Sequence, residues 1–400
     1  MLCLLDSSEF IQKVNSFGTV GSSCPAKAED SLYIPRAIAN TESKLTITCY
    51  DDRGIKWPSG QEKVEGLLSM MGSDDLPVRA TVVDSIDGTY CVSYTPKACG
   101  EHELKIMVES QPIKRSPLYL YVHEKRKYKE CTKHCQSFST SGGASDVAVD
   151  EFGNVYAVID EQHYIQVFDK SGTVIRSIGT KGSTENDFNS PCGIAIQGDM
   201  LYVTDRGNNC VYKVSTSGEF VTKFGSKGSE KGQLSEPRSI CLDRDGRIYI
   251  AEGNNNRVSV FEPDGTFGHH ITDSKSDGSN LCSPWGVAFD PTGNLHVTNY
   301  GSSYIIVFTP EGNYVKEYFC SVSRLAGIAI DEEGHSFVAE NHYDYDDFFG
   351  TTTYCSPFIF DSDHQRIHTL KKFQYAKRVA IDQEGYFYVT SAKDKLVYKY

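Results

Sequence analysis

The stretch RSICLDRDGRIYIAEGNNNRVSVF, residues 238–261, decides the fold of this chain. Its first five residues alternate as a half-buried strand does. A turn is expected from Asp243 to Gly246, because Asp can accept hydrogen bonds from the backbone ahead and Gly can adopt positive φ. Residues 247–251 and 258–261 predict two further strands, separated by a polar loop. The stretch therefore predicts a small antiparallel sheet, with a fourth strand around Phe267.

The phrase Asp-x-x-Gly, preceded by two apolar residues, recurs along the chain. Its aspartates are Asp150, Asp243, Asp290, Asp331 and Asp382. Recurrence every roughly 40 to 50 residues indicates an array of supersecondary units. One four-stranded sheet cannot bury both of its faces, so neighbouring sheets must stack, and radial stacking of such sheets makes a β-propeller.

The repeats predict six units, of which the second departs from the pattern by having Gln197-Gly198-Asp199 instead of Asp-x-x-Gly. The units begin near Ser145, Cys192, Arg238, Trp285, Leu325 and Arg378. The last unit ends at Tyr400 after only three strands. We expect residues 131–140 to supply its fourth strand, because this pairing would close the ring and remove an open sheet edge. The sequence therefore predicts a six-bladed propeller over residues 141–400, preceded by a linker and closing strand over 125–140.

The repeat units resemble the NHL repeat. Residues 202–211 (YVTDRGNNCV) and 251–258 (AEGNNNRV) carry its strand and its polar loop, and residues 224–234 (FGSKGSEKGQL) resemble its spacer. The WD40 repeat is a poorer match, since neither Trp-Asp nor Gly-His occurs at the required places. The resemblance implies an NHL-type β-propeller.

The N-terminal third does not follow this period. Short alternating strands are expected at 44–50, 78–83, 90–94, 103–108 and 118–122, which is typical of a β-sandwich. The phrases DGTYCVSYTP (87–96), GEH (100–102) and SPL (116–118) resemble the filamin-type immunoglobulin repeat. We therefore assign residues 31–124 to an immunoglobulin-like domain of this type. Residues 1–30 are expected to form a residual helix or linker.

Cys49 and Cys91 could suggest an immunoglobulin-type disulfide. Alternation argues against it, because Tyr90, Val92 and Tyr94 share the expected inward face of their strand, which points Cys91 outward. We expect the thiol of Cys91 to be free.

A filamin-type domain followed by NHL repeats resembles the C-terminal half of the tripartite-motif (TRIM) NHL proteins. The resemblance implies the substrate-recognition half of an E3 ubiquitin ligase for protein ubiquitination, without the RING finger, B-boxes and coiled coil. It also implies an alternative, an RNA-binding post-transcriptional repressor. The residues themselves contain no phosphate loop, nucleophile elbow or His-Glu-x-x-His. We therefore expect a non-catalytic interaction module without a cofactor, whatever activity a parent ligase has.

Charge and cysteine content narrow the class of partner. The net charge is −13, and from Cys131 onward 35 acidic residues face 24 basic ones. A DNA-binding domain usually has a basic footprint, so we expect no DNA partner. The 13 cysteines are scattered singly, which suits reduced thiols, a cytoplasmic location and no zinc site. No apolar run is long enough to cross a membrane.

The candidate binding site lies on the propeller rim, where loops concentrate binding residues on a rigid scaffold. Its predicted residues are Arg206, Asn208, Asn209, Arg238, Asn255, Arg257, Trp285, Tyr300 and Tyr304. Arg, Asn and aromatic side chains serve both single-stranded RNA recognition and protein hot spots. The alternative is structural: the asparagines cap turns, and Arg206 and Arg257 brace neighbouring blades. All three interpretations stay open at this point.

Two further groups of residues, one aromatic and one basic, have structural explanations that need no ligand. The insertion 340–358 is rich in aromatic residues and predicts either a loop folded on itself or a partner contact. Lys371, Lys372, Lys377 and Arg378 form a basic cluster that we interpret as a solvated turn.

Overall fold

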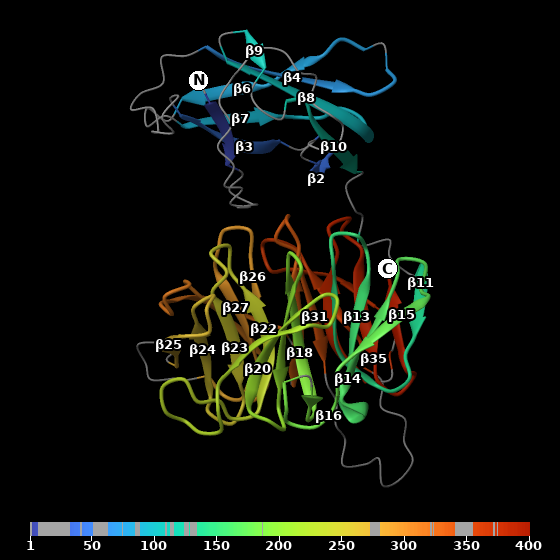
Figure 1. Ribbon diagram of the computed structural model, residues 1–400, viewed down its shortest axis with the longest axis vertical. Helices are drawn as coiled ribbons and strands as arrows, with labels where there is room; N and C mark the ends of the chain where they lie inside the picture. Colours follow the sequence, from blue (N-terminus) through green and yellow to red (C-terminus); the bar gives the residue numbers. More distant parts are fainter. Residues whose placement is uncertain are drawn as a thin grey trace. The chain divides into compact units, whose positions relative to one another are not determined.

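The computed structural model describes residues 2–6, 33–40, 42–50, 63–73, 75–84, 89–108, 110–112, 116–123, 128, 134–185, 187–272, 281–320, 322, 324–340, 355–370, 373 and 375–400. They belong to two compact units, Met1–Arg126 and Lys127–Tyr400. Figure 1 colours the first unit blue to teal and the second green to red. No α-helix occurs within these ranges. The all-β prediction is confirmed.

The N-terminal unit contains two sheets. One has the order β1 (Leu2–Asp6), β3 (Ser43–Tyr50), β7 (Thr89–Tyr94) and β6 (Thr81–Asp84). The other has the order β2 (Tyr33–Ile38), β10 (Leu118–His123), β8 (Gly100–Val108), β4 (Val64–Met70) and β5 (Val78–Arg79), with β9 (Gln111–Pro112) paired to β8. Apolar residues from both sheets, among them Val92, Leu104 and Leu120, form one buried cluster. This is the core of an immunoglobulin-like sandwich.

Strand β7 alternates as the sequence predicts. Tyr90, Val92 and Tyr94 are buried, whereas Cys91 is half-buried and forms no disulfide. The outward orientation of Cys91 is confirmed.

The expectation of a residual helix at the N-terminus is wrong for Leu2–Asp6. These residues form strand β1, which pairs antiparallel with β3. A sheet edge offers a row of unpaired N–H and C=O groups, and a short extended segment satisfies them by pairing there. The rest of that segment, residues 7–30, lies outside the described residues.

The C-terminal unit contains six four-stranded sheets, which we number as blades 1 to 6. Blades 1 to 3 are β12–β15 (Ala144–Val149, Val155–Ile159, Tyr164–Phe168, Val174–Ile178), β18–β21 (Pro191–Gln197, Met200–Asp205, Cys210–Ser215, Phe220–Phe224) and β22–β25 (Pro237–Leu242, Ile248–Glu252, Arg257–Phe261, Phe267–Ile271). Blades 4 and 5 are β26–β29 (Pro284–Phe289, Leu295–Asn299, Tyr304–Phe308, Tyr314–Phe319) and β30–β33 (Leu325–Ile330, Ser336–Glu340, Phe358–Phe360, Arg366–Thr369). Blade 6 has the order β34 (Ala376–Ile381), β35 (Phe387–Ser391), β36 (Leu396–Lys399) and β11 (Gln136–Ser139).

Three short elements of the described part of this unit lie outside the blades. Strands β16 (Thr180–Lys181) and β17 (Asp187–Phe188) form a parallel pair, and a 3-10 turn, η3, covers Asp160–Gln162.

The first strands of the blades form a closed ring. Each of β12, β18, β22, β26, β30 and β34 contacts the next, and β34 contacts β12 again. Figure 1 shows the strands of successive blades side by side, from green through yellow to red. Strand β11 pairs antiparallel with β36, so the last blade takes its fourth strand from the start of the unit. The six-bladed propeller is confirmed.

Part of the stretch expected as a linker belongs to the propeller core. Tyr128 is 3% exposed, and its ring contacts Phe337 and Phe387 edge-on at 4.9 and 6.2 Å between centroids. Its hydroxyl donates to the carbonyl of Gly385. The chain is therefore anchored between blades 5 and 6 before it reaches β11.

The Asp-x-x-Gly turns join the first and second strands of five blades. In blade 3, the Oδ1 atom of Asp243 accepts the backbone N–H groups of Asp245 and Arg247 at 3.0 and 2.8 Å, and Gly246 has φ of 81°. An L-residue would be strained at this φ. The recurring phrase thus fixes each turn locally, and the strands on either side begin in register.

Candidate functional site

A cavity of about 90 Å³ opens where the first strands of the blades begin. It is lined by Ser145, Asp160, Cys192, Arg206, Arg238, Trp285, Lys377 and Arg378. These residues come from every blade except the fifth, which places the cavity on the axis of the ring. We call it the axial cavity.

Most of the lining residues share one position in the repeat. Ser145, Cys192, Arg238, Trp285 and Lys377 are the second residues of the first strands of their blades. In each blade the pairing register shifts at this point. Such an irregularity bends the strand and re-aims a side chain. The repeat therefore brings the same position from several blades to one point.

Arg238 and Trp285 form the aromatic side of the cavity. The guanidinium carbon of Arg238 lies 3.7 Å from the centroid of the Trp285 ring. The Tyr300 ring stacks on the Trp285 ring at 4.8 Å and 28°. Burial lowers the pKa of Arg238 from its ordinary value, and the positive charges of Arg378 and Arg206 act in the same direction. Arg238 nonetheless stays cationic, because an arginine in a protein is not deprotonated.

Arg378 is 2% exposed and crosses from blade 6 toward blades 1 and 4. Its Nε lies 3.7 Å from the Oδ2 atom of Asp146, and its Nη1 donates to the carbonyl of Trp285 at 3.3 Å. Burial raises the pKa of Asp146 to about 6, although the charge of Arg378 opposes the shift. Gly327 leaves room for this path, since a Cβ there would lie 2.8 Å from Arg378 Cδ.

Several polar atoms of the cavity have no partner. Within the described residues, five buried side-chain N or O atoms lack a hydrogen bond, and three of them belong to lining residues: Asp160 Oδ1, Arg238 Nε and Arg378 Nη2. The other two are the ring nitrogens of His364. The second oxygen of Asp160, Oδ2, lies 3.7 Å from Lys377 Nζ. Buried polar groups are normally paired, so this concentration makes the cavity the candidate ligand site.

Four of the nine predicted site residues come together here. Arg206, Arg238 and Trp285 line the cavity, and Tyr300 stacks on Trp285. Arg206 is exposed, and its only side-chain hydrogen bond among the described residues is a long one, at 3.4 Å, to Ser190 Oγ.

The three predicted asparagines hold loops together. Asn208 and Asn255 each donate from the side-chain amide to the carboxylate three residues earlier and to a carbonyl of the preceding loop. Asn209 has φ of 52°, and its Oδ1 accepts the backbone N–H of Glu236. The structural interpretation describes these three residues.

The remaining two predicted residues lie away from the cavity. Arg257 is 6% exposed and donates to Glu252 and to the carbonyls of Ser229 and Gln233, so it braces a loop. Tyr304 is exposed at the start of β28 and contacts Phe319 of the outer strand. Neither residue is among those that line the cavity.

Lys377 and Arg378 belong to the cavity, and their interpretation as a solvated turn is wrong. Arg378 is buried, and Lys377 faces Asp160. The position of Lys377 in the repeat, equivalent to that of Arg238 and Trp285, was the signal that would have identified it, and Arg378 is the next residue. Asp160, Ser145 and Cys192 were also not predicted. Lys371, Lys372 and residues 341–354 of the aromatic insertion lie outside the described residues.

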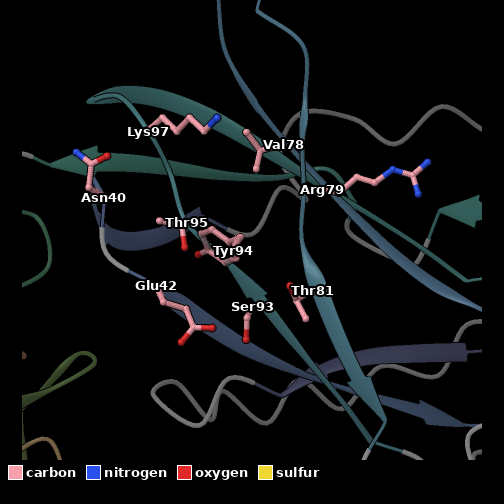
Figure 2. Close-up of a pocket in the computed structure, with 9 residues that line it drawn as sticks. All are labelled: Asn40, Glu42, Val78, Arg79, Thr81, Ser93, Tyr94, Thr95 and Lys97. Carbon is pink, nitrogen blue, oxygen red and sulfur yellow. The ribbon is translucent and has the colours of Figure 1, made fainter.

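A larger groove, of about 380 Å³, lies on the N-terminal unit. Figure 2 shows its lining residues, which come from both sheets. They include Glu42, Arg79 and Lys97, and Figure 2 shows the Arg79 side chain directed away from the others. None of the buried unpartnered atoms found in the described residues belongs to this groove. The propeller cavity is therefore the stronger candidate.

The described residues contain neither a metal-binding cluster nor a membrane-spanning helix. No three His, Cys, Asp or Glu side chains gather there to hold a metal ion. No helix in these parts of the chain is both long and apolar enough to span a membrane.

Family patterns match both units. The filamin/ABP280 repeat matches residues 23–119, and the NHL repeat matches residues 234–261, within blade 3 and the loop before it.

Two of the curated proteins that resemble this chain are named as ligases. The human (Homo sapiens) E3 ubiquitin-protein ligase TRIM45 is 30% identical over 135 residues, which cover 34% of this chain and 23% of that protein. The E3 ubiquitin-protein ligase TRIM71 of Gallus gallus is 29% identical over 168 residues, which cover 40% of this chain and 19% of that protein. The chain thus spans about a fifth of the length of the relatives it matches.

Solved structures share the fold. A gluconolactonase from Xanthomonas campestris superposes with a TM-score of 0.51 at 16% identity, over 66% of this chain and 86% of that one. A protein of unknown function from Bacteroides thetaiotaomicron has a TM-score of 0.50 at 12% identity, over 91% of this chain and 95% of that one. At such identities only the architecture is comparable.

Together with the two family patterns and the ligase relatives, the order of the units shows that this chain has the filamin–NHL architecture of the tripartite-motif proteins.

Proposed function

We propose that the chain is a non-catalytic recognition module that binds a partner on the propeller face where the axial cavity opens. The observation that carries the proposal is the set of four cations, Arg206, Arg238, Lys377 and Arg378, gathered around one cavity in an otherwise acidic unit. Such a local field attracts a negatively charged group and disfavours neutral or cationic ones.

A protein partner is favoured over single-stranded RNA. Trp285 already carries the Arg238 guanidinium and stacks with Tyr300, so little of its ring is left for a base. The cavity is also small for a nucleobase. RNA stays the second candidate, because the same four cations suit phosphate groups.

The relatives extend the proposal to a cellular role. TRIM45 and TRIM71 are named as E3 ubiquitin-protein ligases. In a longer protein of this kind, the propeller would hold the protein that is to be ubiquitinated, while the ligase chemistry would lie in another domain. A role in post-transcriptional repression would follow instead if the bound partner is RNA.

Charge reversal tests which face binds. Arg206→Glu and Lys377→Glu are each expected to reduce capture of a cross-linked partner from cell lysate about tenfold or more, since each inverts the local potential. Arg244→Glu is the matched control, because Arg244 lies in the turn at the opposite end of β22. Cross-linked proteins and RNA are identified separately by mass spectrometry and sequencing.

Equal capture by all three variants would contradict the proposal. Loss of cross-linked RNA alone, with protein capture unchanged, would make the RNA alternative the correct one.

A further inference from the structure

Two of the unpartnered atoms in the axial cavity are hydrogen-bond donors. Arg238 Nε and Arg378 Nη2 are buried, and neither has a hydrogen-bond acceptor among the residues that the structure describes. Leaving a buried donor unpaired costs about 1–3 kcal/mol, and more for a charged group. Both residues line the same cavity from different blades. A ligand oxygen that bonds to both would remove that cost, and a charged oxygen would do so best.

The size of the cavity limits this ligand to a single small group. Its volume of about 90 Å³ is well below the roughly 150 Å³ of an apolar protein cavity that holds benzene. A carboxylate and the methylene that carries it fit such a space, whereas an aromatic ring does not. The charge balance agrees, because four cations line the cavity with only one carboxylate, that of Asp160.

Asp160 distinguishes between kinds of anion. Its Oδ1 is buried without a partner, although its Oδ2 faces Lys377. An acceptor so close to an anion site repels a second anion unless the ligand also brings a donor. A peptide has backbone N–H groups beside each carboxylate, whereas a phosphodiester has no donor at all.

On these grounds we infer that the axial cavity binds one carboxylate of a protein partner, held by Arg238 and Arg378, with a neighbouring backbone N–H of that partner donating to Asp160. The carboxylate comes from an Asp or Glu side chain or from a chain terminus. This inference rests on the proposed function of the propeller face and specifies the chemistry of its partner.

Calorimetric titration of the full chain with small probes tests the inference. The probes are a blocked glycine peptide with one central aspartate, its asparagine counterpart, a glycine peptide with a free C-terminal carboxylate, and dimethyl phosphate. We expect an aspartate or C-terminal carboxylate peptide to bind, and the asparagine peptide to give no heat. Which of the two carboxylate peptides binds more tightly identifies the source of the group.

Two variants separate the roles of the cavity residues. Arg238→Met is expected to weaken binding of the carboxylate peptide about tenfold or more, since it removes a charge-assisted hydrogen bond. Asp160→Ala is expected to weaken binding of the carboxylate peptide, because it removes an acceptor for the peptide N–H. Binding of dimethyl phosphate should stay unchanged or become tighter, because the same substitution removes a negative charge. Arg244→Met is the control, and thermal melts verify that each variant is folded.

Three results would overturn the inference: equal binding of the asparagine peptide, dimethyl phosphate binding as tightly as the carboxylate peptides, or an Asp160→Ala variant that keeps its peptide affinity. Charge reversal that abolishes partner capture while no peptide binds would leave the proposed function intact and remove only this inference. Peptide binding without any effect of charge reversal on capture would remove the proposed function instead.

Discussion

Replacing Phe138 with Ala is expected to lower the free energy of unfolding of the propeller by about 3–5 kcal/mol. Phe138 is 1% exposed on β11, the strand that completes blade 6 from the start of the unit. Its ring packs at 5.6 Å from Phe168 of blade 1 and 6.1 Å from Tyr388 of blade 6. The substitution therefore opens a cavity where the first and last blades meet.

The position of Phe138 makes the effect larger than at an ordinary core site. Strand β11 covers the edge of β36, and a loosened β11 exposes that edge to other chains. We expect concentration-dependent aggregation of Phe138→Ala on heating as well as a lower denaturant midpoint. Ser137→Ala is the control, since Ser137 is exposed on the same strand. A Phe138→Ala variant within about 1 kcal/mol of the parent would show that the ring does not depend on this closure.

The propeller could be predicted from sequence because its repeat acts locally. Each Asp-x-x-Gly phrase makes its own turn, and the Asp243 carboxylate and the positive φ of Gly246 need no distant partner. Ring closure followed from counting strands. The strand at Leu2–Asp6 was missed because its structure depends on the edge of β3, which no local pattern reveals.

The cavity could be predicted only in part, for a similar reason. Arg238 and Trp285 stand out as unusual residue types at the start of a strand. Lys377 and Arg378 look like any basic cluster until the register shift at the start of β34 aims them at the ring axis. Asp160 follows a strand of blade 1 and meets Lys377 only when the ring closes.

Residue type alone did not show which asparagines bind a ligand. Asn208 and Asn255 were predicted as binding residues, yet both satisfy a carboxylate and a loop carbonyl in their own blades. Sequence gives the loop and the residue type, but hydrogen-bond partners decide whether a side chain is available to a ligand.

Glu252→Ala is expected to destabilise the propeller by about 3–5 kcal/mol, because it leaves the charge of Arg257 buried without a counter-ion. Glu252 is fully buried at the end of β23, and Arg257 is 6% exposed. Arg257 Nε lies 2.8 Å from Glu252 Oε1, and Glu252 Oε2 accepts the Ser235 N–H at 2.7 Å. The pair therefore fastens the loop before blade 3 to the blade itself.

Removing both charges separates the ion pair from the packing. Glu252→Leu combined with Arg257→Met should be less destabilised than the sum of the two single variants, since neither charge is then left unpaired. Denaturant unfolding of the four proteins in the cycle measures the coupling, with the exposed Glu230→Ala as the control for loss of an acidic side chain. Additive single effects would mean that Arg257 is held by the carbonyls of Ser229 and Gln233 alone.

Blade 2 has Asp205 and Cys210 at the equivalent pair, so the blade itself does not require an ion pair there. The ion pair of blade 3 lies close to Arg238, and its loss should also reach the cavity through Gly253, where a Cβ would lie 2.8 Å from Arg238 Nε.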